Sequence, residues 1–295
     1  MNKIIFIVNP NSGTIKEKSG LIERLEEICK KETNGLFEVQ THFTEGPGHA
    51  TKLAQQAVLE KVDLCIAIGG DGTMNETAIG LIGSETSLGI IPIGSGNGLA
   101  RHIGISLKPE IAIKQLLHGK SKWMDVGKIA DRFFFLAAGI GFEGTVSKVF
   151  SEQKKRGFSQ YLKSASKAFW SYKPLEIRLN NKKTKVFTLT FANGSQYGNN
   201  AFIAPGASIF DRLLNVTQIF PFPIFKGFEL IYRLLNQKLK PNRYCKMEAM
   251  KQVDVELETE TPGHVDGEPI VLPKSFLVEV IPEKLKIRIP LRPIK

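Results

Sequence analysis

Two short glycine-rich segments hold the residues with the clearest potential for chemistry. Residues 69–76 have the sequence GGDGTMNE, and residues 92–99 have the sequence PIGSGNGL. Each segment follows a short apolar run, 64–68 or 88–93, that is typical of a buried parallel strand, and precedes a stretch that can form a helix. Glycine at such a turn lets backbone amides approach an anion such as a phosphate, because no Cβ intervenes. The pattern therefore favours an anion site over the simpler interpretation, a pair of tight strand-to-helix connections.

The elements that must position these turns alternate along the first part of the chain. Thr73 followed by Glu76 predicts a capping box, so the helix after the first turn is expected to begin at the turn itself. Repeated strand–helix alternation predicts an α/β domain with a parallel sheet. The apolar patterns place strands at 4–8, 37–43, 64–68 and 88–93, and helices at 19–31, 49–61 and 109–118.

The pattern changes near residues 120–130, after which short strands dominate and an antiparallel β domain is expected. We therefore predict an α/β domain over 1–125 and a β-rich domain over 126–283, with the segment 284–295 returning to the first domain. Asn180 and Asn181 are expected to form a hairpin turn. The strands are placed at 123–130, 133–138, 175–179, 185–192, 201–203, 215–220, 244–250, 253–259, 276–281 and 285–289, and the helices at 139–150, 160–172 and 224–237.

The composition is that of an ordinary globular protein, with 295 residues, 42% hydrophobic and 23% charged. Three scattered cysteines match no zinc spacing and imply no disulfide framework, which fits a reducing cytoplasm. No apolar run approaches the ~18 residues of a helical membrane span, and the N-terminus lacks a signal-peptide core. The net charge of +11 favours an acidic partner such as nucleic acid, anionic lipid or a nucleotide, although solvated lysines would give the same charge.

Polar loops follow all four expected parallel strands, at the edge where open α/β sheets bind ligands. Hydroxyls, amides and backbone N–H groups should converge there, so we expect a nucleotide cradle. The sequence contains neither a Walker A loop nor a dinucleotide fingerprint after its first strand. The candidate cradle residues are Asn9, Ser12, Gly13, Thr44, Gly69, Gly70, Asp71, Gly72, Thr73, Met74, Asn75, Ser95, Gly96 and Asn97.

Three motifs in order, NPNSG at 9–13, GGDGTxNE at 69–76 and PxGSGN at 92–97, resemble the diacylglycerol-kinase catalytic-domain family. The match is closest to its soluble bacterial lipid kinases, with sphingosine and ceramide kinases in the same superfamily. The similarity extends to Asp125, Asp211 and the Asp-Gly-Glu sequence at 266–268, so it covers nearly the whole chain. The resemblance implies an NAD-kinase-like α/β domain followed by a sandwich-like β domain that receives the lipid.

The resemblance also implies roles for individual residues. Thr44, the first glycine turn and Ser95 correspond to ATP contacts, and Asp71 is expected near the phosphates and their magnesium as a catalytic residue. Glu268 corresponds to the family's proton acceptor. The implied magnesium site consists of Ser208, Asp211 and Leu213, with Asp125 joined to its network.

The residue chemistry agrees with these roles, because phosphoryl transfer needs positioning, charge neutralisation and a base. Mg²⁺ prefers carboxylate and water oxygens, which Asp71, Asp125 and Asp211 could supply. Asp71→Asn is accordingly expected to reduce turnover without cost to the fold. For Glu268 a plain alternative exists: Asp266 and Gly267 form an ordinary hairpin turn with a solvated glutamate beside it.

The sequence departs from the bacterial diacylglycerol kinases at three positions. Ser95 replaces a threonine, Gly98 replaces an aspartate after the Asn, and Arg212 replaces the usual glycine. The predicted function is an ATP-dependent lipid kinase that moves the γ-phosphate to a hydroxyl of a membrane lipid such as diacylglycerol, with a role in phospholipid metabolism. A sphingoid-base or ceramide kinase and a low-activity nucleotide-binding lipid sensor remain alternatives, while an NAD kinase fits the motifs less well.

Two stretches, 154–173 and 219–240, mix aromatic and basic residues in a way that suits an anionic membrane surface. The alternative is that the aromatic residues belong to the core and the lysines to a solvated face. No recognition motif supports nucleic acid, so none is expected as a partner. The expected partners are ATP, a membrane lipid and, in peripheral contact, an anionic membrane, and a homodimer is compatible with the sequence.

Overall fold

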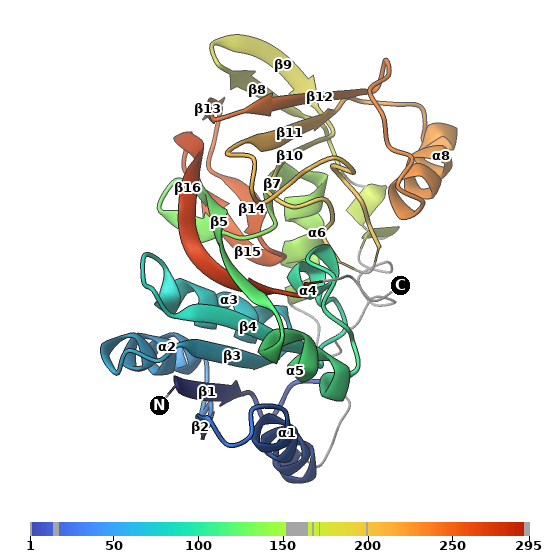
Figure 1. Ribbon diagram of the computed structural model, residues 1–295. Helices are drawn as coiled ribbons and strands as arrows, with labels where there is room; N and C mark the ends of the chain where they lie inside the picture. Colours follow the sequence, from blue (N-terminus) through green and yellow to red (C-terminus); the bar gives the residue numbers. More distant parts are fainter. Residues whose placement is uncertain are drawn as a thin grey trace. The chain divides into compact units, whose positions relative to one another are not determined.

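The structure is a computed structural model, and it describes residues 2–13, 18–151, 165–166, 168–170, 172–198 and 200–291. The chain divides into two compact units (Figure 1). The first consists of Met1–Met124 with Glu283–Lys295, and the second of Asp125–Pro282. The strands β5 (Lys120–Ile129) and β16 (Ser275–Ile289) each contribute residues to both units.

The first unit is an α/β fold around a parallel sheet, as predicted. Its strand order is β2–β1–β3–β4, followed by the end of β16, where Ile287 pairs in parallel with Leu88. The residues of β3 and β4 are buried throughout, which explains their continuous apolar sequences. The strands are β1 (Asn2–Val8), β2 (Phe37–Phe43), β3 (Leu64–Gly69) and β4 (Ser87–Pro92).

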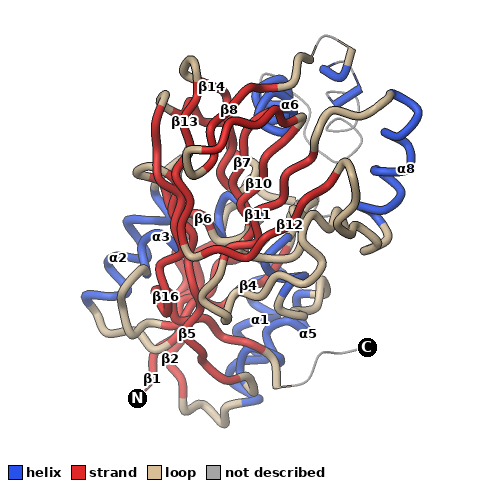
Figure 2. The backbone as a smooth tube through the Cα atoms, turned by 90° about the horizontal axis from the view of Figure 1, so that it is seen from above, coloured by secondary structure: helices blue, strands red, loops and turns tan. Residues whose placement is uncertain are grey.

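Helices cover both faces of this sheet, with α1 beside α5 on one side and α2 beside α3 on the other (Figures 1 and 2). Each connection runs from the carboxyl end of a strand into a helix, so the polar loops gather at one edge of the sheet. The helices are α1 (Lys18–Glu32), α2 (His49–Leu59), α3 (Asp71–Leu81), α4 (Gly98–His102) and α5 (Pro109–Leu117).

The second unit consists of two sheets that share one hydrophobic core. One sheet has the antiparallel order β12–β11–β10–β7–β14–β15, and the other joins β9, β8 and β13 to the first part of β16, with β5 and β6 beside it. The strands are β6 (Arg132–Phe134), β7 (Ala137–Gly141), β8 (Leu175–Leu179), β9 (Lys182–Val186), β10 (Thr188–Ala192), β11 (Leu214–Ile219), β12 (Cys245–Met250), β13 (Gln252–Leu257), β14 (Thr261–Val265) and β15 (Glu268–Leu272). The helices α6 (Phe142–Ser151) and α8 (Ile224–Leu235) complete it. The expected hairpin between 175 and 192 forms, with Asn180 and Asn181 both at positive φ.

Three predicted elements of this unit have the wrong bounds, and hydrogen bonds to other segments explain each difference. The strand expected at 133–138 splits into β6 and β7, because the Asp266 carboxylate accepts the N–H groups of residues 135–137. The strand expected at 185–192 splits at Phe187, where the chain leaves the pairing with β8 and joins the pairing with β11. The helix expected at 139–150 begins only at Phe142, because residues 137–141 pair with β10 and β14.

The predicted strands differ from the structure at three further places. Residues 201–203 form no strand, and the segments 276–281 and 285–289 belong to one long strand. The strands β14 and β15 were not among the predicted strands, although a hairpin turn at Asp266 and Gly267 was considered as an alternative. Most of the helix expected at 160–172, and much of the stretch 154–173, lies outside the described residues. Among the helices that are described, none is long and apolar enough to cross a bilayer.

Candidate functional site

The two glycine turns of the first unit lie against each other. A Cβ on Gly94 would lie 2.6 Å from the Gly70 Cα, and a Cβ on Gly96 would lie 2.5 Å from an Asp71 carboxylate oxygen. A Cβ on Gly69 would meet the Thr73 side chain at 2.5 Å. These glycines are therefore required by packing between and within the turns. The sequence suggested a different reason, namely that glycine lets a phosphate approach the backbone amides.

Asp71 joins the two turns through its carboxylate. Its Oδ2 accepts the N–H of Asn97 at 2.9 Å, and its Oδ1 accepts the N–H of Gly98 at 2.8 Å. These amides stand at the start of α4, whose positive end favours a carboxylate. Both carboxylate oxygens thus orient the second turn, and Gly98, which lacks the family's carboxylate, contributes its backbone amide instead.

The capping box predicted at Thr73 and Glu76 is wrong. The N-cap of α3 is Gly70, which makes no side-chain cap. The Glu76 carboxylate accepts the N–H of Ala50 at 3.2 Å, in the first turn of α2, and the Thr73 hydroxyl accepts a hydrogen bond from Asn9 Nδ2 at 3.1 Å. The first turn of α3 is therefore left without a side-chain cap, which suits an anionic ligand at this end of the helix.

Two polar groups near these turns are buried. Asn75 is 7% exposed, and its Oδ1 has no hydrogen-bond partner among the described residues. Lys18, 6% exposed, reaches back from the start of α1 so that its Nζ donates to the Ser12 carbonyl at 2.6 Å, and burial lowers the pKa of this lysine. Sequence analysis missed Lys18, although a lysine soon after the NPNSG loop was a usable signal.

The remaining cradle residues differ in exposure. Gly72 and Ser95 are exposed, Met74 is buried, and the Thr44 N–H donates to the Val8 carbonyl at 2.8 Å, beside the end of β1. Gly13 has φ of +70° and packs against the Ile93 carbonyl, so the first loop also contacts the second glycine turn. The structure thus brings the predicted residues of all four loops to one edge of the sheet.

The predicted metal residues lie together in the second unit. Asp125 is 1% exposed, and its Oδ2 accepts the N–H of Arg212 at 2.7 Å. The Asp211 carboxylate accepts the N–H of Leu213 at 3.0 Å, and the Ser208 hydroxyl accepts the N–H of Phe210 at 3.3 Å. The loop 208–213 is therefore ordered by its own side chains and anchored to a buried carboxylate.

Arg212 has φ of +62°, a conformation in which a residue with a Cβ costs on the order of 1 kcal/mol. This conformation accounts for the glycine that the resemblance led us to expect here. The hydrogen bond from its N–H to Asp125 holds the backbone in place. The departure at Arg212 therefore changes the side chain and leaves the loop closed on Asp125.

Whether this loop suits Mg²⁺ depends on its oxygen atoms. Within the residues that the structure describes, no group of three or more His, Cys, Asp or Glu side chains could hold a metal. The loop offers the Asp211 carboxylate, the Ser208 hydroxyl and backbone carbonyls, which are the hard oxygen ligands that Mg²⁺ accepts when water completes an octahedral set. The residues present fit the ion on this condition.

Glu268 is exposed at the first position of β15, directly after the turn that joins β14 to β15. Asp266 and Gly267 form this two-residue turn, with φ of +47° and +87°. Asp266 does more than turn the chain: its carboxylate accepts the N–H groups of Phe135 at 2.8 Å, Leu136 at 2.8 Å and Ala137 at 3.0 Å. The turn that presents Glu268 is thereby fixed to the segment between β6 and β7.

Two further hydrogen bonds hold the same turn. The Ser147 hydroxyl donates to the Gly267 carbonyl at 2.7 Å, and the Gly267 N–H donates to His264 Nδ1 at 3.3 Å. The other ring nitrogen of His264 lies 3.5 Å from the carboxylate of Glu143. The backbone next to Glu268 is therefore connected to a buried polar group on α6.

Sequence analysis missed this buried group. Glu143 is 7% exposed and accepts hydrogen bonds from the hydroxyls of Thr190, at 3.0 Å, and of Tyr197. A second missed residue, Asn193, is fully buried, and its Nδ2 donates at 2.9 Å to the carbonyls of Asp125 and Phe135. Asn193 thus joins β5, which carries Asp125, to the segment between β6 and β7 that Asp266 holds.

The Asp266 carboxyl gives a pH-dependent prediction. Burial raises its pKa from 3.8 to about 6, against the opposing effect of the three N–H groups. Because the folded pKa lies above the unfolded one, the carboxyl favours folding when protonated, and this contribution is lost as the pH rises from 3.8 to about 6. We expect the free energy of unfolding of the wild type, relative to Asp266→Asn, to fall across this window in urea titrations.

The matched control is Asp254→Asn, an exposed aspartate on β13 of the same unit. Comparison with this variant separates the effect of Asp266 from the removal of one carboxylate at an exposed site of the same unit. A rise in the relative stability of the wild type between pH 4 and 6 would contradict the raised pKa of Asp266.

Family models match both units. The model of the diacylglycerol kinase catalytic domain matches residues 3–129, and the model of the YegS C-terminal NAD kinase beta sandwich-like domain matches residues 137–289. The chain belongs to this lipid kinase family. The resemblance seen in the motifs is confirmed, and with it the assignment of the chain as an enzyme with a catalytic kinase domain.

Individual relatives span nearly the same length. A protein of Chromohalobacter salexigens named "Probable lipid kinase YegS-like" is 28% identical over 283 residues, which are 92% of this chain and 91% of that protein. The diacylglycerol kinase of Mycobacterium tuberculosis is 30% identical over 254 residues, 77% of this chain and 79% of that one. A crystal structure of a diacylglycerol kinase from Bacillus anthracis superposes with a TM-score of 0.74 at 21% identity, covering 99% and 98% of the two chains, and supports the fold.

Proposed function

We propose that this lipid kinase transfers the γ-phosphate of ATP to a hydroxyl of a membrane lipid of the diacylglycerol class, with Mg²⁺. The observation that carries the proposal is the edge of the first unit, where the N-terminus of α3, the Asn75 side chain and Lys18 lie among the polar loops. The N-cap of α3 makes no side-chain hydrogen bond, and the Asn75 Oδ1 has no hydrogen-bond partner within the described part of the chain. Backbone N–H groups and an ammonium bind phosphate oxygens, and an amide oxygen accepts from a hydroxyl or amino group.

Each group of this edge has a part in holding the nucleotide. The N–H groups at the start of α3 bind phosphate, and Lys18 adds a positive charge beside the loop of Ser12. Asp71 keeps the second glycine turn in place by binding the amides of Asn97 and Gly98. The exposed Ser95 offers its hydroxyl from that turn.

In the second unit, the loop of Ser208, Asp211 and Leu213 would hold Mg²⁺ through carboxylate and backbone oxygens. The bound ion would neutralise phosphate charge as it develops during transfer. Asp125 positions this loop by accepting the Arg212 N–H, and it is nearly inaccessible to solvent. The loop is therefore shaped before the ion binds.

Glu268 is the proposed general base. It takes the proton from the lipid hydroxyl as that oxygen attacks the γ-phosphorus, the bond from phosphorus to the bridging oxygen of ATP breaks, and ADP leaves. The turn before it is fixed by Asp266, Ser147 and His264, so Glu268 begins a strand with a constrained backbone. A constrained backbone limits the positions that the carboxylate must search.

The deciding experiment incubates the protein with γ-labelled ATP, Mg²⁺ and a panel of lipids in mixed micelles, followed by separation of the labelled lipids. We expect label in diacylglycerol, in a reaction that chelation of Mg²⁺ abolishes. Label confined to a sphingoid base or ceramide would identify the related kinases instead. ATP binding without label in any lipid would favour a lipid sensor. The proposed location is the cytoplasmic side of a membrane, in peripheral contact.

A further inference from the structure

The helix α8 of the second unit carries an apolar face that is exposed to solvent. No residue of this helix is buried. Phe225 is 64% exposed and Phe228 is 79% exposed. The exposed apolar residues follow the i, i+4, i+7 spacing of one helix face, and they are Ile224, Phe225, Phe228, Ile231, Tyr232 and Leu235. We name these six residues the α8 apolar face.

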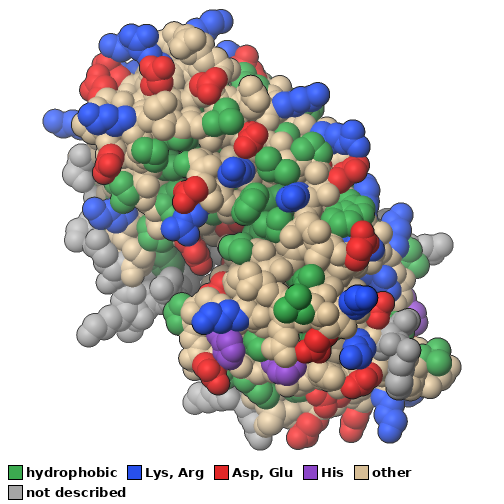
Figure 3. All heavy atoms as spheres, turned by 90° about the vertical axis from the view of Figure 1, so that its left-hand side faces the viewer, with side chains coloured by type: hydrophobic (Ala, Val, Ile, Leu, Met, Phe, Trp, Pro, Cys, Tyr) green, Lys and Arg blue, Asp and Glu red, His purple; other side chains and the backbone are tan. Residues whose placement is uncertain are grey.

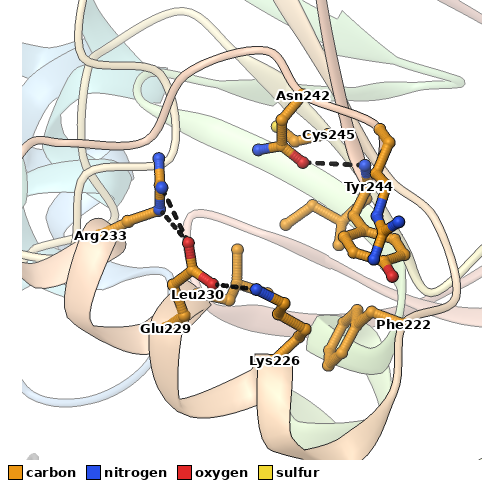
Figure 4. Close-up of a pocket in the computed structure, with 10 residues that line it drawn as sticks. Phe222, Lys226, Glu229, Leu230, Arg233, Asn242, Tyr244 and Cys245 are labelled. Carbon is orange, nitrogen blue, oxygen red and sulfur yellow. Dashed lines mark hydrogen bonds and ion pairs between the residues drawn. The ribbon is translucent and has the colours of Figure 1, made fainter.

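The rest of the helix faces the protein, which reverses the usual arrangement of a surface helix. Glu229 forms ion pairs of 2.8 Å with both Lys226 and Arg233, and all three line a pocket of about 230 Å³ that also contacts Tyr244 (Figure 4). Leu230 and Leu234 pack against a core cluster. Packing among the described residues of the unit therefore does not account for the α8 apolar face, because polar groups and two leucines already attach the helix.

The chain that follows α8 is strongly cationic. From Asn236 to Cys245 the sequence contains three basic residues, Lys238, Lys240 and Arg243, and no Asp or Glu. On either side of this run, Arg233 pairs with Glu229 and Lys246 pairs with Glu248. On the face of the molecule in Figure 3, by contrast, basic and acidic side chains are interspersed. The cationic run near α8 directly follows the helix that carries the exposed apolar face.

One of these cations lies directly at the α8 apolar face. Lys238 Nζ lies 3.3 Å from the Tyr232 hydroxyl and 5.4 Å from the centre of its ring. A tyrosine with an apolar ring and a polar tip, beside a lysine, is the arrangement found where a helix meets the boundary of a bilayer. The lysine can stay among lipid headgroups while the ring lies among acyl chains.

We propose that α8 docks this enzyme on an anionic bilayer, with the α8 apolar face in the boundary between headgroups and acyl chains and Lys238 and Lys240 on the headgroups. The chemistry of both parts is matched by one partner, because anionic phospholipids present negative charge immediately above hydrocarbon. The proposal deepens the proposed function, since it specifies how a lipid kinase reaches lipid, yet it concerns binding and not phosphoryl transfer.

The test is flotation with vesicles of phosphatidylcholine alone or with phosphatidylglycerol added. The wild type should float with the anionic vesicles, and the bound fraction should fall as salt rises. The double variant Phe225→Gln/Phe228→Gln should bind about tenfold or more weakly, because the buried apolar area sets the affinity. Lys238→Gln/Lys240→Gln should lose the preference for anionic vesicles. The matched control is Leu59→Gln, an 82% exposed leucine on α2, which should bind like the wild type.

A second measurement tests the proposal even if the double variant does not fold. In Phe228→Trp, which keeps the apolar face, the added indole should shift its emission to the blue when anionic vesicles are present. Unchanged flotation of Phe225→Gln/Phe228→Gln with an unchanged circular dichroism spectrum would overturn the proposal. The proposal would also be overturned if the wild type were a dimer, the double variant a monomer, and neither bound vesicles. The α8 apolar face would then contact a second copy of the chain.

The two proposals can fail separately. Phosphorylation of a short-chain, monomerically dispersed diacylglycerol should be equal in the wild type and in Phe225→Gln/Phe228→Gln, because α8 contributes nothing to the proposed chemistry. Flotation without label transfer to any lipid would refute the proposed function alone. Label transfer with no vesicle binding in the wild type would refute the docking helix alone.

Discussion

Glu268→Gln abolishes transfer of phosphate to lipid and leaves ATP binding unchanged: this is the largest effect that we expect. A lipid hydroxyl has a high pKa and attacks poorly unless a base accepts its proton, an assistance worth about a hundred- to ten-thousand-fold. Glutamine keeps the size of the side chain but cannot take the proton. Glu268 belongs to the second unit and the glycine turns to the first, so nucleotide affinity should not depend on this carboxylate.

The measurements are lipid phosphorylation at saturating ATP and ATP affinity by calorimetry. Glu260→Gln is the matched control, an exposed glutamate just before β14 of the same hairpin, and should retain full activity. Near wild-type transfer by Glu268→Gln would place the base elsewhere, and Asp71 would be examined first. Loss of ATP binding in the same variant would mean that the carboxylate contributes to the nucleotide site.

Asp71→Asn is expected to reduce turnover by about a hundredfold or more and also to destabilise the first unit. The amide of asparagine has one acceptor oxygen where the carboxylate uses two, so its NH₂ group must face the N–H of Asn97 or Gly98. A lost hydrogen bond and a facing pair of donors cost about 1–3 kcal/mol. The displaced second glycine turn, together with the lost negative charge, should then disturb the positions of the phosphates.

This expectation differs from the one drawn from the sequence, in which Asp71→Asn left the fold intact. Urea unfolding and turnover measured on the same preparation separate the two. Asp131→Asn, an 89% exposed aspartate in a turn, serves as the control and should change neither quantity. A large loss of turnover at unchanged stability would mean that Asp71 acts only through its charge, as the sequence suggested. Wild-type turnover together with wild-type stability would refute both expectations.

The glycine turns show why Asp71 has this double effect. Gly70 and Gly94 are so close that neither turn can move toward the other. The Asp71 carboxylate also holds the two turns together, because it accepts the N–H of Asn97 at the start of α4. Three loops are coupled in this way, because Gly13 of the first loop also packs on Ile93. A substitution in one loop should therefore be felt in the others, as expected of residues that share partners.

The sequence alone predicted the α/β fold of the first unit and the polar loops that gather at one edge of its sheet. The reason is that parallel strands buried on both faces give continuous apolar runs, as in β3 and β4, while the loops after them must be polar. The ordered motifs at 9–13, 69–76 and 92–97 likewise predicted the family. Four of their glycines, Gly13, Gly69, Gly94 and Gly96, stand where a Cβ would collide with a neighbouring residue.

Tertiary structure alone decided where the strands of the second unit begin and end and which partners the buried polar groups have. β6 and β7 are separated by a carboxylate that is 130 positions from Leu136 in the sequence, and Glu76 accepts the N–H of Ala50, which lies 26 residues earlier in α2. Glu143 meets Thr190 and His264 only because three strands bring them together. Apolar periodicity reports burial along one segment, and it carries no information on which distant donor or acceptor will satisfy a buried polar group.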